Sequence, residues 1–358
     1  MPRIKLASLK IHICDLVSFN AVNQASQTVK WSDKGYWVST LYKYQSLIYW
    51  IGYSAYFRSL TFFSAANPAL HLGGMLDDTK TAIYDLTQEK YLPKTIVVTQ
   101  QDDLEQELAK ARISLPFIVK PNVGFKGFMV RRIDYIEELL EIQSQFGNRE
   151  MLIQEFLAHN SEYSIMCYRL KNNRGYGISS FVEKVMPFIV GDGQQTIKEL
   201  VQNLDNPFLK KEVVYKKFEA KGDEVLAKQE KLVIDHVGNY ARGSKFYDRA
   251  DHIDEALHGA IDDFFSEFDG LNFGRLDLKA DSIAHIKDGN FKLLEINGAK
   301  AEPIHIYDPE LSWSQIVRDI SFHWKTLFKI VKENSDQKVP TTAEGWKSFW
   351  SLKKAVNS

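Results

Sequence analysis

Two short segments in the C-terminal half of the chain alternate apolar and polar residues with the two-residue period of a β-strand. Residues 274–278 read G-R-L-D-L and residues 294–297 read L-E-I-N, with a D-G-N turn signal at 288–290 between them. Side chains two apart on a strand share a face, so each segment has one polar face and one buried face. We therefore predict two paired strands whose polar side chains are Arg275, Asp277, Glu295 and Asn297.

If these strands pair, one wall of their sheet carries two carboxylates, an amide oxygen and a guanidinium. Hard oxygen ligands of this kind suit Mg²⁺, or Mn²⁺ in its place, when the ion keeps some water and bridges phosphate oxygens. The same alternation also fits a solvated sheet face, in which charged residues serve solubility. The segment by itself leaves both interpretations open.

A second pattern is a hairpin with a glycine-bearing tip. Residues 117–120 and 128–133 are apolar runs joined by P-N-V-G-F-K-G, which contains Gly124 and Gly127. Glycines allow backbone N–H groups to approach a phosphate, and Lys120 at the end of the first run supplies a positive charge. The chain contains no G-x-x-x-x-G-K-[ST] motif, so this is not a P-loop. The alternative is a surface hairpin with a snorkelling lysine.

A third pattern is the strand end I-Q-E-F-L at 153–157, followed by Glu162. Polar residues and free backbone groups at a strand end could hydrogen-bond the edge of adenine, and a carboxylate just beyond could hold ribose hydroxyls. An ordinary strand end with an exposed glutamate explains the same residues.

The order of these patterns along the chain resembles the ATP-grasp superfamily, and in particular its carboxylate–amine ligases. D-alanine–D-alanine ligases and the ligase portion of cyanophycin synthetases are the relatives compared, and the resemblance covers about residues 67–310. It implies that Lys120 and Lys80 contact ATP phosphates, that Glu162 binds ribose, and that Arg275 neutralises the acyl phosphate. It further implies a closing loop at Gly124 and Gly127, an adenine-binding hinge at Gln154, Glu155 and Leu157, and magnesium ligands at Asp277, Glu295 and Asn297.

Two more segments resemble the cyanophycin-synthetase type of ligase. The resemblance makes Lys184 a candidate contact of the γ-phosphate, and Arg242 a candidate contact of the substrate carboxylate or the transferred phosphoryl group. A turn at a helix N-terminus and a surface loop are the alternatives. We also expect Glu302 and His305, which follow the L-E-I-N strand, to face the acceptor substrate; packing of a turn is an equal alternative.

The expected fold class is α+β, an ATP-grasp fold of two α+β lobes around ATP, preceded by a mostly helical region. The expected division is 1–75 for the N-terminal region, 76–157 for the small lobe, 158–335 for the large lobe and 336–358 for a tail. Residues 1–75 lack the α/β unit that usually completes the substrate site in this family. We expect their aromatic stretch at 46–57 to be a buried helix, with a membrane-surface role as the minor alternative.

Composition limits the partners. The formal net charge is −1, so no overall basic field points to nucleic acid. Two cysteines, Cys14 and Cys167, cannot form a disulfide framework, which favours a reducing, cytoplasmic location. The oligomeric state is not indicated. Small-molecule carboxylate and amine substrates, of amino-acid or peptide type, are what the family resemblance implies.

The resemblance thus implies an ATP- and magnesium-dependent ligase that forms a C–N bond through an acyl phosphate. The competing interpretation is a module of the same fold that binds ATP without catalysis and signals by closing.

Overall fold

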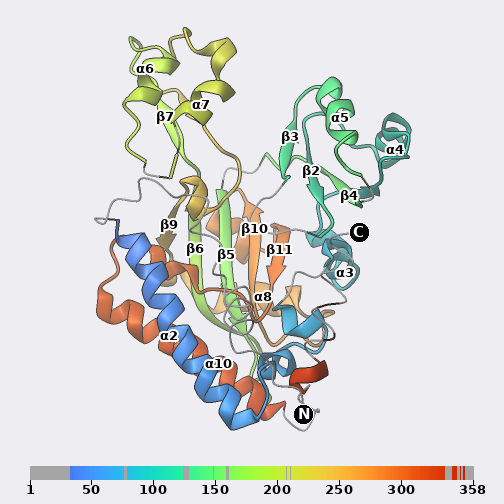
Figure 1. The fold of residues 1–358 in the computed structure, drawn as a ribbon, viewed down its shortest axis with the longest axis vertical. Helices are drawn as coiled ribbons and strands as arrows, with labels where there is room; N and C mark the ends of the chain where they lie inside the picture. The colour runs from blue at the N-terminus through green and yellow to red at the C-terminus, as the bar shows by residue number, and fades with distance from the viewer. Residues whose placement is uncertain are drawn as a thin grey trace, which may run out of the picture.

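The computed structural model describes residues 33–75, 79–123, 129–147, 149–158, 161–206, 208–209, 211–334, 341–344, 347 and 350. It shows three β-sheets and a layer of long helices (Figure 1). The two larger sheets belong to the two lobes that the sequence predicted, and helix α2 precedes them. The α+β fold class is therefore confirmed. The lobe boundaries at residues 75, 157 and 335 stay predictions, as does the role of the tail.

The small lobe is a four-stranded antiparallel sheet in the order β1-β4-β2-β3. Its strands are β1 (Thr95–Val98), β2 (Phe117–Pro121), β3 (Arg131–Ile133) and β4 (Met151–Glu155). Helices α4 (Leu104–Ala111) and α5 (Ile136–Gln143) bury their apolar sides against this sheet. The predicted hairpin is confirmed, since Phe117 pairs with Ile133. Gly124 and Gly127 at its tip lie outside the described residues.

The large lobe is a five-stranded antiparallel sheet in the order β11-β10-β5-β6-β9. Its strands are β5 (Ser161–Tyr168), β6 (Gly177–Val185), β9 (Lys245–Asp248), β10 (Phe273–Ala280) and β11 (Lys292–Asn297). The predicted pairing of the two alternating segments is confirmed, because Asp277 lies directly opposite Glu295. Between β10 and β11 the chain forms the short helix α9 (Ile283–Lys287) before the predicted turn, so the connection is longer than a simple hairpin.

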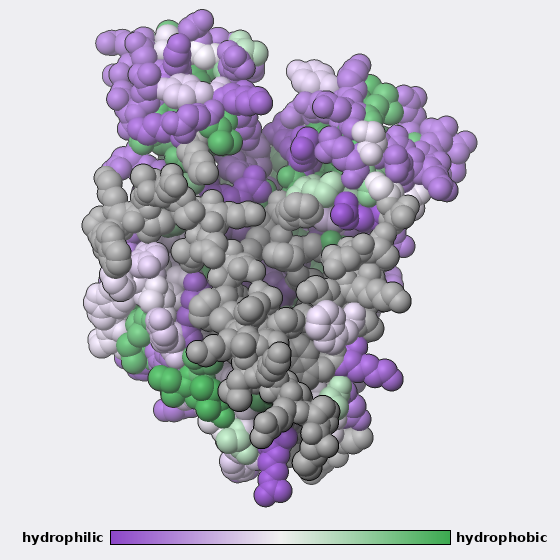
Figure 2. Space-filling view, in the orientation of Figure 1, coloured by the Kyte–Doolittle hydropathy of each residue, from purple (hydrophilic) through white to green (hydrophobic). Residues whose placement is uncertain are grey.

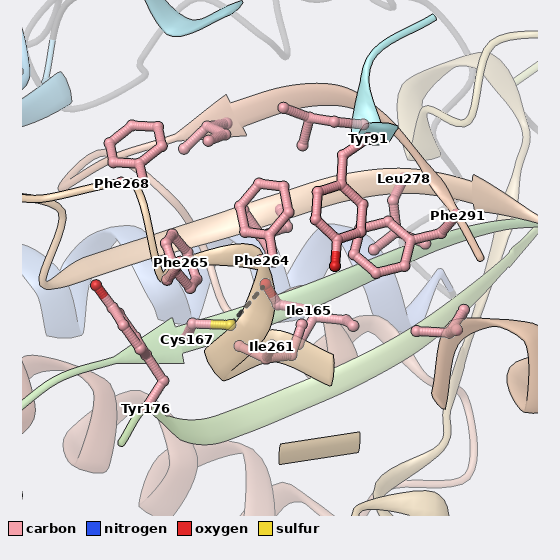
Figure 3. Close-up of a cluster of buried hydrophobic side chains, with 14 of the residues drawn as sticks. Tyr91, Ile165, Cys167, Tyr176, Ile261, Phe264, Phe265, Phe268, Leu278 and Phe291 are labelled. Atoms are coloured by element: carbon pink, nitrogen blue, oxygen red, sulfur yellow. Dashed lines mark hydrogen bonds between the residues drawn. The ribbon is translucent and has the colours of Figure 1, made fainter. Parts of the chain in front are cut away.

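Helix α8 (Glu255–Phe264) begins at Asp254, whose side chain accepts a hydrogen bond from the backbone N–H of Leu257. The helix covers the apolar face of the large sheet. Figure 3 shows the aromatic core beneath it, where Tyr176 stacks on Phe265 at 4.1 Å between ring centroids. Cys167 is buried and free in this core, and Cys14 lies outside the described residues. Burial raises the pKa of the Cys167 thiol, which keeps it protonated and unreactive.

Residues 188–233 form a separate small unit on top of the large sheet (Figure 1). It contains strands β7 (Phe188–Val190) and β8 (Lys231–Val233) and helices α6 (Ile197–Gln202) and α7 (Lys211–Lys217). Within the charged segment 205–230, α7 is the one described α-helix, and the residues beyond it lead back to β8.

Helix α3 (Lys80–Asp85) begins after Thr79, whose side chain caps it, and α5 begins after Tyr135. Asp134 pairs with Arg132 at 2.7 Å, so it is engaged outside the helix.

Helices α2 (Lys34–Phe57) and α10 (Trp313–Glu333) lie side by side along the large sheet (Figure 1). The indole Nε1 of Trp324 donates to Ser46 Oγ at 2.8 Å in their buried contact. The expected buried helix at 46–57 is only half correct: Ser46, Trp50 and Ser54 are buried, whereas Ile48 and Ile51 are 71% and 56% exposed. No described helix is long and apolar enough to cross a membrane.

One buried side chain fastens the N-terminal region to the large sheet. Asn67 is fully buried, and its Nδ2 donates to the carbonyls of Gly73 and Phe273 at 2.9 and 2.7 Å. Its Oδ1 accepts from the backbone N–H groups of Asn272 and Phe273 at 2.9 and 2.8 Å. Four buried hydrogen bonds thus join the segment after α2 to the start of β10.

We expect Asn67→Ala to destabilise the protein by about 3 kcal/mol or more, since it leaves buried backbone groups without partners. Urea unfolding followed by circular dichroism measures the loss. Asn290→Ala is the matched control, because Asn290 is exposed in a turn. Equal midpoints for the two variants would contradict the role given to Asn67.

Candidate functional site: an ionic cluster between two sheets

The site is built around Asp277 in the middle of the large sheet. Asp277 lies between Glu295 on β11 and Ser164 on β5 in the strand register. The alternation of β10 turns Asp277 and Arg275 to one face and Leu276 and Leu278 into the core. This is the polar wall that the sequence predicted.

Five donors converge on the Asp277 carboxylate. Arg275 donates from Nε to Oδ1 at 3.0 Å and from Nη2 to Oδ2 at 3.1 Å. Lys184 Nζ lies 3.3 Å from Oδ1, Asn297 Nδ2 donates to Oδ2 at 3.2 Å, and the Ser164 hydroxyl donates to Oδ1. We call these five residues the Asp277 cluster. Burial disfavours the charged carboxylate, but Arg275 and Lys184 outweigh burial and hold the pKa of Asp277 well below its usual range.

Lys184 is shared by two acids. Its Nζ donates to Glu162 Oε1 at 2.8 Å in addition to its contact with Asp277. All three side chains are buried. Burial alone would lower the pKa of Lys184, yet the two carboxylates raise it, so the lysine stays charged.

Glu295 has a different environment from that of its neighbour. Among the described residues, no donor forms a hydrogen bond with its carboxylate. Burial raises the pKa of Glu295, and the negative charge of Asp277 adds to this, while Lys80, Arg275 and Lys120 act in the opposite direction. A partly buried carboxylate with a raised pKa beside several cations is typical of a ligand-binding site.

The small lobe places two lysines against this wall. Lys120 on β2 is buried and donates to Tyr84 Oη at 3.1 Å and to Gln154 Oε1 at 2.9 Å. Burial lowers the pKa of Lys80 on α3, and the charge of Glu295 opposes that shift. Both lysines are therefore close enough to Glu295 of the large lobe to act on its pKa, and their contact with ATP phosphates stays a prediction.

The donor set fits Mg²⁺ in its chemistry. Asp277, Glu295 and Asn297 present hard oxygen atoms on neighbouring strands. Within the described part of the chain, no group of three or more His, Cys, Asp or Glu side chains could hold a metal by itself. A cation at this site would therefore need the amide of Asn297 and ligand oxygens beside the two carboxylates.

The predicted hinge, residues 154–157, lies at the end of β4. The side chain of Gln154 is directed into the small sheet, where its Nε2 also donates to Tyr84 and Thr95, so it positions Lys120. Glu155 accepts from the backbone N–H of Lys94 at 2.9 Å. The carbonyl of Leu157 accepts from Lys279 Nζ at 3.2 Å. These contacts leave the backbone N–H of Leu157 as the predicted contact of adenine.

Glu162, the predicted ribose ligand, is buried and paired with Lys184. The backbone of Gly238 lies directly against it, since a Cβ at this position would be 2.4 Å from Glu162 Oε1. A larger residue here would displace the Glu162 carboxylate from its present position.

The structure does not bring Arg242 to the Asp277 cluster. Arg242 lies in the 3₁₀ helix Tyr240–Arg242, and its Nε donates to Asp235 Oδ2 at 2.8 Å. Its charge acts on Lys217 of the small unit. In this turn, residues 238–243, Asn239 caps the short helix by accepting from the backbone N–H of Ala241.

Helix α2 lies beside Glu302, which we predicted to face the acceptor substrate, and no sequence pattern connected this helix with the site. Tyr307 Oη donates to Glu302 Oε2 at 2.8 Å, and Arg275 Nη1 donates to the Glu302 carbonyl at 3.2 Å. Tyr42 and Lys43 of α2 lie within electrostatic range of Glu302. His305 is directed elsewhere, with Nε2 at 3.2 Å from Asp319 on α10.

Several participants were missed from the sequence. Ser164 is a single serine in an apolar strand and Tyr84 is a single tyrosine on a short helix, so neither forms part of a sequence pattern that indicates a site. Lys279 continues the R-L-D-L alternation by one step, so the two-residue period could have identified it.

No family model and no curated protein sequence matches this chain. Solved structures are similar to it at TM-scores of 0.37 to 0.40. A bifunctional glutathione synthetase from Pasteurella multocida is 16% identical over 73% of this chain and 37% of its own. A D-alanine–D-alanine ligase from Bacillus anthracis is 14% identical over 72% and 66%. An N5-carboxyaminoimidazole ribonucleotide synthetase from Thermus thermophilus is 14% identical over 62% and 45%.

The chain thus spans about a third to two thirds of the length of these structures. D-alanine–D-alanine ligases, which the sequence motifs resemble, are among them. These structures match only part of this chain, so the function is argued from the side chains described above.

The two metal-site carboxylates should differ in their effect on stability. Asp277→Asn leaves buried Arg275 without its carboxylate partner and Lys184 with Glu162 alone, so we expect a loss of about 3 kcal/mol at neutral pH. Glu295→Gln removes a negative charge that lies beside Asp277, so we expect stability within about 1 kcal/mol of the wild type, or above it. Thermal and urea unfolding measure both.

The pH dependence separates the same two groups. Because the pKa of Asp277 is lowered, its stabilisation is complete above the ordinary carboxyl value of about 4 and is lost as the pH falls further. Because the pKa of Glu295 is raised, acidification from neutral pH should stabilise the wild type relative to Glu295→Gln. Parallel curves for the wild type and both variants would contradict these assignments.

Proposed function

We propose that this protein is an ATP-dependent carboxylate–amine ligase of ATP-grasp type. The observation that carries the proposal is the proximity of Lys80 and Lys120 on the small lobe to Glu295 on the large lobe, where Glu295 lies directly opposite Asp277 in the strand register. Two lysines would hold the phosphates, and two acids would hold the cation that accompanies them. A sheet face that served only solubility would be exposed, whereas Lys120, Asp277 and Asn297 are buried.

A carboxylate needs activation before an amine can displace its oxygen. Transfer of the γ-phosphoryl group of ATP to the carboxylate would create an acyl phosphate with a good leaving group. Attack by the amine would then release phosphate and leave the new C–N bond, with ADP as the other product. The protein contributes positioning and charge neutralisation rather than a covalent step.

The residues divide this work by position. Lys120 and Lys80 would contact the phosphates from the small lobe, and Lys184 would reach the γ-phosphate from the large one. Asp277, Glu295 and Asn297 would hold Mg²⁺, which when bound would neutralise charge on the phosphate oxygens. Arg275 lies between Asp277 and Glu302, so it is placed to face charge that develops on the acyl group.

The acceptor would enter beside Glu302. This carboxylate lies with Tyr307 and close to Arg275, which joins the acceptor side to the acylation side. Burial lowers the pKa of Lys300, in the loop after β11, to about 8. Its proximity in sequence to Asn297 makes it a candidate contact of a substrate carboxylate.

Lys120→Ala should weaken nucleotide binding at least about tenfold, because it removes a buried cation that faces the phosphates. Isothermal titration with Mg-ATP or Mg-ADP measures the affinity. Lys110→Ala is the control, since Lys110 forms only an exposed pair with Glu107. Unchanged affinity in Lys120→Ala would remove this lysine from the site.

The activity itself is tested by ADP release over a panel of amino acids, short peptides and amines. Hydroxylamine is added to trap an acyl phosphate as a hydroxamate. We expect release only with a matching carboxylate, and a loss of at least about 100-fold in Glu295→Gln.

Wild-type turnover in Glu295→Gln would contradict the metal assignment. Thermal stabilisation by Mg-ATP, without ADP release from any mixture, would instead identify a nucleotide-binding module of the same fold.

A further inference from the structure

Helix α2 carries large apolar residues on both its inner and its outer face. Its inner face, with Val38, Tyr42 and Trp50, is buried against the protein. On its outer face Tyr44, Ile48 and Ile51 are 67%, 71% and 56% exposed. A surface helix normally has a polar outer face, so these exposed apolar residues point to a binding surface.

Helix α10 extends this outer face. Gln45 of α2 donates through Nε2 to the Val317 carbonyl at 3.0 Å and to Ser321 Oγ at 2.8 Å, which fixes the two helices side by side. Trp313 and Val317 on α10 are exposed large hydrophobic residues. Figure 2 shows hydrophobic surface where Figure 1 draws this helix pair. We call this surface the α2–α10 face.

The two helices together carry a net positive charge. Together α2 and α10 contain six basic and two acidic residues, whereas the whole chain has a net charge of −1. Helix α2 has no acidic residue at all. Both acids of α10 are engaged: Asp319 with His305, and Glu333 with the backbone N–H of Lys171. Arg318, Lys325 and Lys329 are exposed.

We propose that the α2–α10 face docks on the surface of an anionic lipid bilayer. Exposed Trp, Tyr and Ile side chains beside Lys and Arg are the composition that lies in a membrane interface. The basic residues add attraction to anionic headgroups. The inner face of α2 stays on the protein, so the helix lies flat on the bilayer and does not insert across it.

A second copy of the chain is a less suitable cover. In a symmetric dimer the same face meets itself, so Arg318, Lys325 and Lys329 would approach other basic residues. Neither helix supplies unengaged acids to balance them. Anionic lipid supplies that balance, and it does so independently of the ligase activity.

The test is flotation of the full-length protein with vesicles of phosphatidylcholine alone, or mixed with phosphatidylglycerol. We expect binding to the mixed vesicles and a decrease when salt is added. Ile48→Glu should lower the bound fraction at least about tenfold, because it places a charge in the interface. Val213→Glu is the matched control, since Val213 is 63% exposed on α7, outside this face.

Thermal melting checks that Ile48→Glu is folded, and Lys325→Glu/Lys329→Glu tests the electrostatic part without touching the apolar side chains. Wild-type protein that floats with neither vesicle overturns the proposal. So does Ile48→Glu that binds as well as Val213→Glu. Sedimentation velocity that shows a wild-type dimer broken by Ile48→Glu, with no vesicle binding, would assign the face to a second copy.

Discussion

The ion pairs of Asp277 with Arg275 and Lys184 are the interaction on which the large lobe depends. Each of these groups loses its hydration on burial, and their mutual contacts, together with those to Glu162, Asn297 and Ser164, offset that loss. The contacts exist only in the observed strand register. A slip of one residue along β10 would exchange Asp277 for Leu276 or Leu278 and place a charge in the apolar core. The cluster therefore selects one pairing of the five strands.

The charged groups beside the Asp277 cluster are less well compensated by opposite charge than Asp277 itself. Asp277 takes the donors of Arg275, Asn297 and Ser164, whereas Glu295 on the next strand has no hydrogen-bond donor in the part of the chain that the structure describes. Burial also lowers the pKa values of Lys80 and Lys279, so their charged forms are disfavoured. Charges that the protein alone disfavours reduce its stability, and they are expected where a charged ligand completes the site. A bound nucleotide phosphate would place negative charge beside the lysines, and its cation would place positive charge beside Glu295.

The features that could be predicted from sequence are those with a short, regular pattern of apolar and polar residues. The alternation at 274–278 and 294–297 predicted the pairing of β10 with β11, and the apolar runs around Lys120 predicted the β2–β3 hairpin. Ser164 could not be predicted, because one serine in the apolar strand β5 has no periodic signal. The role predicted for Arg242 stays a prediction: its described partner is Asp235, in a turn capped by Asn239, and the sequence does not show that Asp235 takes its guanidinium. Which elements meet across the chain, such as α2 with Glu302, is decided by tertiary packing.

Helix α2 precedes the small lobe in the chain and packs beside Glu302, on the predicted acceptor side. Successive residues of a helix point about 100° apart, so Tyr42 and Lys43 can face Glu302 while Tyr44 faces outward. Asn67 and the Trp324–Ser46 hydrogen bond hold the helix in place from its C-terminal end and its centre. Because the outer residues are also apolar, the sequence of α2 has the pattern of a core helix. The structure distinguishes the two faces by what each one meets: the inner face meets the acceptor side and α10, and the outer face meets the surroundings of the protein.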